Sequence, residues 1–354
     1  MISSPGAQFC DADMGNFYVN TFLPEAVYVR IKRKDIPKEI IEENNLNEEY
    51  FDNKGYAMVK VIKAIYGLPQ SGRLAHEDLK KHLAKYEYEP MEHTHGLWKH
   101  KSRRTTFTLV VDDFGICYFN EADKKHLIDA LKARYPVKVG EGKKYVGIDF
   151  EWDYGKNRQV VLSMNGYIPK ANKEFGHPNP AKPVYGPTPF LAPEYGKRIQ
   201  YAKEDTSPKV DKKMKNFIQK VAEKYLYPAR AIDHTMLQPL NDLCIASNSA
   251  TEQTMIDLKH FLDYCATNPD PKIIFRASDM LLQIWTDAAY LVAPKARSRA
   301  AGYHFLGNKD GNLHNGPIYV LSKLIKAVMS SAAEAESGGS FMNATEAVPF
   351  RTTL

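Results

Sequence analysis

The chain has 354 residues, a length that suits two or three domains. Of these residues, 44% are apolar and 25% charged, a composition that is typical of folded proteins and argues against disorder. Its net charge of +6 permits a polyanionic partner without requiring one. The four cysteines lie far apart without a C-x-x-C pair, which argues against a disulfide framework or zinc knuckle and favours a reducing compartment. We find neither a secretory signal nor an apolar run of about 18 residues, the length a membrane helix needs. We therefore expect a soluble intracellular protein with no membrane partner.

The first strand signal covers residues 7–19, an apolar stretch that contains two carboxylates, Asp11 and Asp13. Because these two aspartates are two residues apart, they should share one strand face, and Asp11 is interpreted as a surface carboxylate. A core strand this early in the sequence has no preceding element to pair with, so we expect a missing N-terminal segment. Residues 28–31 predict another strand, and the polar residues 32–54 predict a solvated loop with one helical turn.

Strand-like alternation returns at residues 56–66 and is broken by the sequence GLPQSG at 67–72. A helix is predicted to follow over residues 73–86, because leucines recur there at helical spacing. A short strand near residues 96–98 then leads to a basic loop at 99–104, whose charges could contact phosphates near a nucleic-acid site. Three histidines in this region lack a coherent set of metal-ligating partners and are interpreted as loop residues: His93, His95 and His100.

The most informative stretch is FTLVVDDFGICYF, residues 107–119. Two apolar runs flank Asp112 and Asp113 without an intervening Gly or Pro, which predicts a β-hairpin with both carboxylates at its turn. Adjacent carboxylates against buried strands are costly to ionise, and a hard cation such as Mg²⁺ would offset that cost. An Asp-Asp pair on its own is also an ordinary polar turn.

The chain after this hairpin predicts a helix over residues 121–135 with Asn120 as its N-cap. Residues 145–154 alternate cleanly between apolar and polar positions, which predicts one half-buried strand, paired with residues 160–163. Further elements are predicted in this order: helices at 210–227, 235–246 and 251–266, strands at 283–287, 300–306 and 316–321, and a helix from about residue 332. Strands followed by a helix indicate a small α+β domain at the end of the chain.

Four segments, in this order, resemble the palm motifs of copia-type retrotransposon reverse transcriptases: DADMGNFYVNTFL (11–23), AIYGLPQSGRLAHEDL (64–79), FTLVVDDFGI (107–116) and YVGIDFEWDY (145–154). The resemblance covers essentially the whole chain and implies an α+β fold. Its expected parts are a reverse-transcriptase palm with an antiparallel sheet and packed helices (1–176, fingers segment missing before it), a proline-rich connector (177–209), a helical thumb or connection (210–270) and a partial ribonuclease H-like domain (271–354).

The resemblance also assigns roles to residues of the first three motifs. Asp13 and Asp112 would bind metal and Asp113 would be the third acidic member, with two Mg²⁺ ions per active site and Mn²⁺ as a substitute. Tyr18 falls where the family places an aromatic ring that excludes the ribose 2′-hydroxyl. Gln70 falls where the family contacts the incoming nucleotide and the template. Taken alone, Tyr18 would be interpreted as a core aromatic rather than as this ring, and Gln70 could be a simple turn residue.

The segments at 281–307 and 330–339 resemble the ribonuclease H domain that accompanies these polymerases. Asp287 would be its first metal ligand and Glu336 its second. Glu334 has the spacing of a capping box with Ser331, so it is expected to hold the helix start rather than a metal ion. The family's next carboxylate lies beyond this helix and is missing here, so we expect no independent ribonuclease H activity on an RNA–DNA hybrid.

The sequence thus predicts an RNA-directed DNA polymerase that extends a primer 3′-hydroxyl with dNTPs on an RNA or DNA template. As implied by the resemblance, it would be a piece of a longer Pol polyprotein that also serves DNA integration, and would act in cytoplasmic particles or the nucleus. An alternative is an inactive retroelement remnant that at most binds nucleic acid. A third is a host protein that uses the palm fold for protein contacts.

Overall fold

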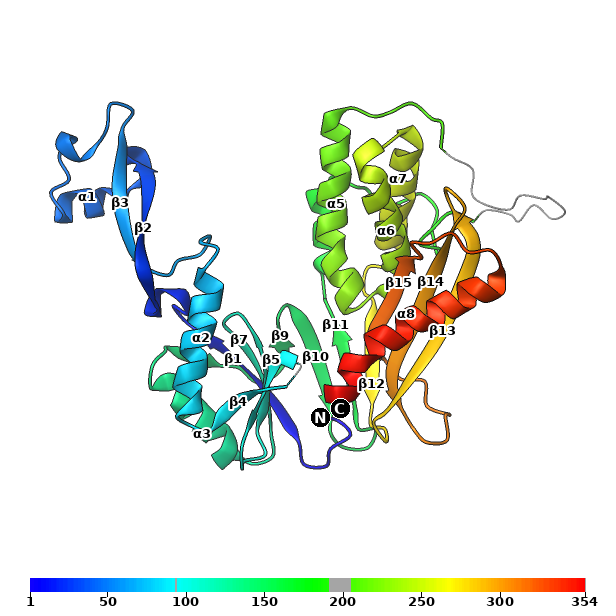
Figure 1. Cartoon of the computed structure of the whole chain (residues 1–354), viewed down its shortest axis with the longest axis horizontal. Coiled ribbons are helices and arrows are strands. Elements are labelled where there is room, and N and C mark those ends of the chain that lie inside the picture. The colour runs from blue at the N-terminus through cyan, green and yellow to red at the C-terminus, as the bar shows by residue number, and fades with distance from the viewer. Residues whose placement is uncertain (93, 191–204, 354) are drawn as a thin grey trace. The chain divides into compact units, whose positions relative to one another are not determined.

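The computed structural model describes residues 1–92, 94–190 and 205–353, and the chain divides into two compact units (Figure 1). The N-terminal unit is Gln8–Glu141, and the C-terminal unit combines Met1–Ala7 with Gly142–Leu354. This division falls inside the palm domain expected over residues 1–176, because residues 142–176 pack with the C-terminal unit.

The N-terminal unit is built on a six-stranded antiparallel sheet with the strand order β4-β5-β6-β7-β1-β8. The strands are β1 (Gln8–Met14), β4 (Tyr88–Met91), β5 (Thr94–His100), β6 (Thr106–Val110), β7 (Asp113–Tyr118) and β8 (Val137–Val139). Helices α2 (Ser71–Ala84) and α3 (Glu121–Lys132) share a core with one face of this sheet. The largest fully buried side chains of that core are Trp98, Tyr88, Phe107 and Phe114.

Alternation along β1 explains which face of the sheet is covered by the helices. Cys10, Ala12 and Met14 are buried in the core, whereas Asp11 and Asp13 alternate with them and lie on the opposite face. The prediction that both aspartates share a strand face is confirmed. The carboxylates are therefore carried on the side of the sheet that the helices leave open.

Helix α3 begins where the sequence predicts it. The Asn120 side chain accepts a hydrogen bond of 2.8 Å from the backbone N–H of Asp123, so Asn120 is the N-cap, as predicted. Leu127, Ile128 and Leu131 are buried and anchor the helix to the sheet. Helix α2 is held to α3 by His82, whose Nε2 lies 2.7 Å from the carbonyl oxygen of Ala130.

A two-stranded arm extends away from the six-stranded sheet of the same unit (Figure 1). Its strands, β2 (Phe22–Lys32) and β3 (Tyr56–Lys63), pair only with each other among the described strands. They are joined by the short helix α1 (Lys38–Glu43) and two 3₁₀ turns, which matches the solvated loop with one helical turn predicted for residues 32–54. Large apolar side chains on the arm are exposed, among them Tyr28 and Met58.

The C-terminal unit contains a four-stranded sheet with the order β12-β11-β10-β9. The strands are β9 (Lys144–Tyr145), β10 (Ile148–Asp153), β11 (Gln159–Ser163) and β12 (Lys272–Arg276). The predicted pairing of β10 with β11 is confirmed, but the prediction of one strand over 145–154 is wrong. The chain reverses at Val146 and Gly147, which have φ of 45° and 81°, so β9 and β10 form a hairpin.

Four helices share the second core of the C-terminal unit: α4 (Tyr167–Glu174), α5 (Lys212–Ala231), α6 (Leu237–Ala246) and α7 (Glu252–Thr267). The last three agree with the helices predicted at 210–227, 235–246 and 251–266. Of the proline-rich connector expected over 177–209, residues 177–190 form no helix or strand, and residues 191–204 lie outside the described residues.

The chain ends in a three-stranded antiparallel sheet of β13 (Leu281–Ala293), β14 (Arg297–Gly307) and β15 (Pro317–Leu324), with α8 (Ala332–Thr353) packed on it. Asn343 of α8 contacts Nε2 of His304 at 2.8 Å and donates to the carbonyl oxygen of Ala301 at 2.9 Å. The described residues thus form a mixed α/β structure with antiparallel sheets and eight helices. Over these same ranges, none of the helices combines the length and apolar character needed to cross a membrane.

Candidate active site

Asp13 lies far in sequence from the adjacent Asp112 and Asp113, and the backbones of all three come together where β1 and β7 run side by side. The antiparallel register places Asp13 directly opposite Asp113. One residue further on, the backbone N–H of Met14 donates to the carbonyl oxygen of Asp112 at 3.0 Å. Because directly opposed residues of an antiparallel pair point to the same face, Asp13 and Asp113 project together from the uncovered face of the sheet.

The turn that carries Asp112 is strained. Val111 and Asp112 are the two loop residues between β6 and β7, and Val110 pairs with Asp113 across the turn. Val111 has a φ of 60°, a conformation that a two-residue hairpin loop requires and that glycine normally supplies. A β-branched residue in this region costs about 1–3 kcal/mol.

The carboxylates repel one another. The pKa of Asp113 is raised above its usual range, first by burial and then by the charges of Asp112, Asp13 and Asp11. The Asp11 carboxylate lies against Gly140, where an added Cβ would come within 2.0 Å of Oδ2 and would force the Asp11 side chain to move. Four acidic groups thus lie near one another, and no cationic side chain contributes to the pKa shift of Asp113.

This donor set suits a hard divalent cation, because such ions prefer carboxylate oxygens and would relieve the repulsion around Asp113. Within the residues that the structure describes, no three His, Cys, Asp or Glu side chains are grouped closely enough to hold a metal ion by themselves. Mg²⁺ is usually bound by one or two carboxylates together with water and substrate phosphates. The residues therefore fit a metal whose remaining ligands come with a substrate.

Tyr18 lies in a short 3₁₀ turn, Tyr18–Asn20, and reaches Asp112 through Tyr66. Its ring is half-buried and packs edge-on against the ring of Tyr66, with centroids 4.5 Å apart and planes at 81°. Its hydroxyl lies near Gly72 at the start of α2, where an added Cβ would be 3.8 Å away. Tyr66 in turn donates a hydrogen bond of 3.1 Å to Oδ2 of Asp112.

Gln70 immediately precedes α2 and is half-buried. Its carbonyl oxygen accepts from the backbone N–H of Leu74 at 3.0 Å, so its backbone belongs to the helix start. Gln70 lies in the turn that the backbone N–H of Ser71 closes on the carbonyl oxygen of Leu68, adjacent to the helix end near the Tyr18 hydroxyl.

Asp78 is a positioning residue that the sequence did not reveal. It accepts from Oγ1 of Thr21 at 3.2 Å and pairs with the guanidinium of Arg134, and so ties the turn after Tyr18 to α2 and to the end of α3. Asp78 lies one residue before the buried Leu79 of α2, inside the palm-like segment 64–79, and the resemblance assigned it no role. Its contacts join residues 56 or more positions apart, which only the fold brings together.

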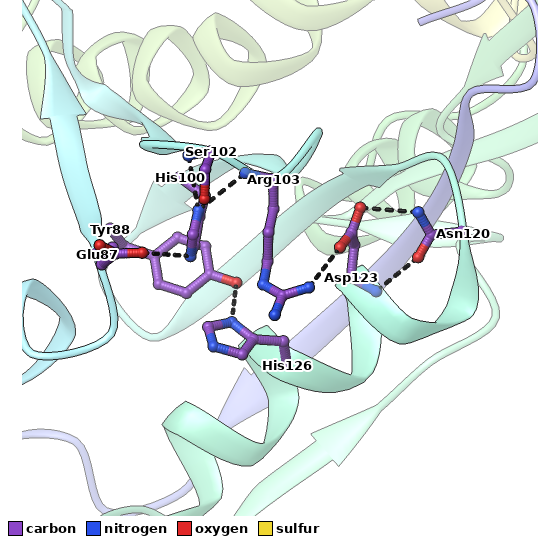
Figure 2. Close-up of polar contacts among 8 residues, drawn as sticks. All are labelled: Glu87, Tyr88, His100, Ser102, Arg103, Asn120, Asp123 and His126. Carbon is purple, nitrogen blue, oxygen red and sulfur yellow. Dashed lines mark hydrogen bonds and ion pairs between the residues drawn. The ribbon is translucent and has the colours of Figure 1, made fainter.

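The basic loop at residues 99–104 is held down by a polar network (Figure 2). Arg103 pairs with Asp123 of α3 at 2.9 Å, and the guanidinium of Arg104 stacks over Phe119 at 3.6 Å from the ring centroid. Both arginines are therefore engaged within the protein. Lys101, by contrast, is an exposed residue at the tip of the loop.

His100 anchors the loop from inside the protein. Its Nδ1 accepts from the backbone N–H groups of Ser102 and Arg103 at 3.1 and 3.0 Å (Figure 2). The interpretation of His100 as a loop histidine is wrong, because it ends β5 with its side chain buried under this turn. His95 also lies in β5, and His93 lies outside the described residues.

The candidate ribonuclease H residues lie in the C-terminal unit. Glu336 accepts from the backbone N–H of Ala288 at 3.3 Å, next to Asp287. Glu334 accepts from the N–H and hydroxyl of Ser330, which lowers the pKa of its carboxyl, and its own N–H donates to Oγ of Ser331. Glu334 is thus engaged in holding the start of α8.

Asp287 of β13 and Glu336 of α8 lie on opposite sides of the three-stranded sheet. Asp287 pairs with Ala301, and an added Cβ at the next residue, Gly302, would collide with Asn343 of α8. Neighbouring strand residues point to opposite faces, so Asp287 lies on the face away from α8. There it lines a cavity of about 370 Å³ with Trp285 and other residues. The helix that carries Glu336 covers the other face.

A family model described as reverse transcriptase (RNA-dependent DNA polymerase) matches residues 13–189, half of the chain. The matched region begins at Asp13 and includes Tyr18, Gln70, Asp112 and Asp113. This chain therefore belongs to the reverse transcriptase family.

Within that family, the chain is of the copia type. It is similar to the Transposon Ty1-BL Gag-Pol polyprotein of Saccharomyces cerevisiae, with 31% identity over 127 residues. It is also similar to the Ty1-GR1 Gag-Pol polyprotein of Saccharomyces cerevisiae, at 30% over 127 residues. Each match covers 32% of this chain and only 7% of the relative, so the chain corresponds to a small part of those polyproteins.

The raised pKa of Asp113 predicts a measurable stability effect. Between the ordinary carboxyl pKa and the raised one, the folded state binds more protons than the unfolded state, so stability falls as pH rises through this window and stays lower above it. Asp113→Asn should therefore raise the free energy of unfolding at pH 7, by at most about 1 kcal/mol because solvent screens this half-buried group. Urea unfolding at pH 7 and pH 4 measures the gain, which should shrink at the lower pH.

Asp35→Asn is the matched control for this experiment, because Asp35 is exposed in the same unit. It should leave the free energy of unfolding unchanged at both pH values. A loss of stability in Asp113→Asn at pH 7 would show that the carboxylates do not oppose folding.

The buried His100 predicts acid sensitivity. Burial, and then the neighbouring His126, lower its pKa below the ordinary value. Between that lowered pKa and the unfolded value of about 6.5, the unfolded state binds more protons, so stability falls as pH decreases through about 6.5. Protonation at Nδ1 would also remove the acceptor for Ser102 and Arg103.

We expect His100→Asn to lose less stability than the parent between pH 7.5 and about 5.5, measured by urea unfolding. His260→Asn is the control, because His260 is far less enclosed and lies in the C-terminal unit. Equal acid sensitivity in the parent and in His100→Asn would show that another group is responsible.

Proposed function

We propose that this chain carries the polymerase centre of an RNA-directed DNA polymerase, which extends a primer 3′-hydroxyl with dNTPs. The observation that carries the proposal is the register that sets Asp13 opposite Asp113, with the backbone of Asp112 hydrogen-bonded to Met14 next to them. Membership of the reverse transcriptase family supports it. Reverse transcriptases in general use divalent metal ions, and the acidic donor set is suited to them.

In this proposal, Asp13 and Asp112 hold the metal ions and Asp113 contributes the third acidic group. Two Mg²⁺ ions, when bound about 3.5–4 Å apart, would activate the attacking hydroxyl and stabilise the leaving pyrophosphate, and Mn²⁺ could replace them. The pairing of two strands fixes the spacing of the carboxylates, so the protein contributes rigid placement. Tyr18 would lie against the sugar and disfavour a 2′-hydroxyl, and Gln70 would contact the nucleotide and template.

The partners proposed for the chain follow from this reaction. They are an RNA or DNA template, a primer and dNTPs, together with other parts of a Pol polyprotein. The curated relatives are named Gag-Pol polyproteins, which supports the last of these. Exposed residues of the basic loop, such as Lys101, would add salt-dependent phosphate contacts.

Primer extension on a poly(rA) template with an oligo(dT) primer and dTTP tests the proposal. The parent should extend the primer in the presence of Mg²⁺ or Mn²⁺. Asp112→Asn should lower the rate by at least about 10²–10³-fold, because it removes a charge needed in the transition state, while primer–template binding is retained. Asp35→Asn should extend like the parent.

An absence of extension by the folded parent, with primer–template still bound, would support the alternative of an inactive remnant that only binds nucleic acid. An absence of both extension and binding would favour a palm fold used for protein contacts.

We further propose that residues 271–354 are a ribonuclease H-like domain without independent activity. The three-stranded sheet with α8 packed on it supports the likeness, and the placement of Asp287 and Glu336 on different faces of β13 argues against a joint metal site. We expect no cleavage of a labelled RNA–DNA hybrid with Mg²⁺ or Mn²⁺. Robust cleavage that is lost in Asp287→Asn would contradict this.

A further inference from the structure

Tyr66 makes two separate contacts at the candidate polymerase site. Its hydroxyl donates a hydrogen bond of 3.1 Å to Oδ2 of Asp112. Its ring packs edge-on against Tyr18, with centroids 4.5 Å apart and planes at 81°. One side chain therefore touches both the carboxylate proposed as a metal ligand and the ring proposed to exclude a ribose 2′-hydroxyl.

Tyr66 does not contribute to the hydrophobic core. It is 66% exposed and precedes Gly67, whose φ of 93° turns the chain toward α2. A large aromatic side chain left exposed at a turn gains little by burial, so its conformation here is set by its two partners. Hydrogen-bonded partners of metal-ligating carboxylates usually fix the orientation of the ligand.

We infer that Tyr66 is a positioning residue that couples the metal ligand Asp112 to the sugar-discriminating ring of Tyr18. The inference rests on the proposed polymerase function for the roles of these two partners. The hydroxyl of Tyr66 orients Asp112, because a bond to Oδ2 selects one rotation of the carboxylate and leaves Oδ1 for a cation. The ring of Tyr66 limits the tilt of the Tyr18 ring and so holds it in the position where it excludes a ribose 2′-hydroxyl.

The two contacts can be separated by two substitutions. Tyr66→Phe removes only the hydroxyl and keeps the ring packing against Tyr18. Tyr66→Ala removes both contacts. Tyr50→Phe and Tyr50→Ala are the matched controls, because Tyr50 is a similarly exposed tyrosine, at 58%, in the same unit.

The first measurement is the affinity for Mn²⁺ in the absence of any reaction, followed by electron paramagnetic resonance. Both Tyr66→Phe and Tyr66→Ala should bind Mn²⁺ about 10-fold or more weakly than the parent, the usual effect of losing a hydrogen-bonded partner of a ligand. Both Tyr50 variants should bind like the parent. Parental or tighter Mn²⁺ binding by Tyr66→Phe would overturn the role of the hydroxyl.

The second measurement is the ratio of the dissociation constants of TTP and the ribonucleotide UTP. Both are measured on the complex of the protein with poly(rA)–oligo(dT). Ca²⁺ is used because it supports nucleotide binding without relying on turnover. Tyr66→Phe should keep the parental preference for the deoxynucleotide, and Tyr66→Ala should lose about 10-fold of it, the scale expected when a packing contact is removed. An unchanged preference in Tyr66→Ala, or its loss in Tyr66→Phe, would overturn the role of the ring.

Urea unfolding of each variant shows whether the substitution has destabilised the whole unit. Such a general loss of structure would weaken both Mn²⁺ binding and the nucleotide preference, in Tyr66→Phe as well as in Tyr66→Ala. The readouts also distinguish this inference from the proposed polymerase function. A parent that binds Mn²⁺ and shows the predicted Tyr66 effects but extends no primer contradicts the polymerase proposal only. A parent that extends primers with unchanged behaviour of both Tyr66 variants contradicts only the inference about Tyr66.

Discussion

The candidate site depends on the antiparallel register between β1 and β7. Because side chains alternate along a strand, a shift of this pairing by one residue would place every core residue of β1 on the open face and Asp13 in the core. The buried residues Cys10, Ala12 and Met14 therefore select the register that sets Asp13 opposite Asp113. The same hydrophobic burial that stabilises the sheet thus gathers acidic groups that would otherwise stay apart.

The cost of this arrangement is concentrated at the hairpin. Burial and like charge raise the pKa of Asp113, and Val111 is held in a backbone conformation that suits glycine better. Neither feature improves the stability of the fold, and both lie at the point where the carboxylates project. A valine with 47% of its surface exposed gains little from packing there, so the strain must be compensated by the surrounding sheet.

The elements that the sequence predicted well are those with strong local signals. Asn120 followed by a periodic apolar pattern indicated the start of α3, and the apolar runs around Asp112 indicated the β6–β7 hairpin. The prediction that both carboxylates lie in its turn was wrong for Asp113, which begins β7 and pairs with Val110. The turn at Val146 was missed because a β-branched residue with positive φ contradicts its own propensity, so the alternation suggested one continuous strand. His100 was misinterpreted because its burial depends on the loop that folds over it.

The supporting residues of the site were beyond local patterns for a similar reason. Tyr66 and Asp78 act through partners that are 46 and 56–57 positions away, and no spacing rule links them to Asp112, Thr21 or Arg134. Tyr66 lies inside the palm-like segment 64–79, immediately before the Gly67 turn, but neither feature indicates its partners. Motifs can indicate which residues carry chemistry, whereas the residues that orient them become visible with the fold.

The strand order of the central sheet also bears on how this chain would acquire its structure during synthesis. Strands β4 to β7 are neighbours both in sequence and in the sheet, so they can pair early. Strand β1 can pair with β7 only after β7 has been synthesised, about a hundred residues later. Its other neighbour, β8, is made later still. Until then the buried residues of β1 have no sheet to pack in, so the step that completes the acidic cluster comes late in synthesis.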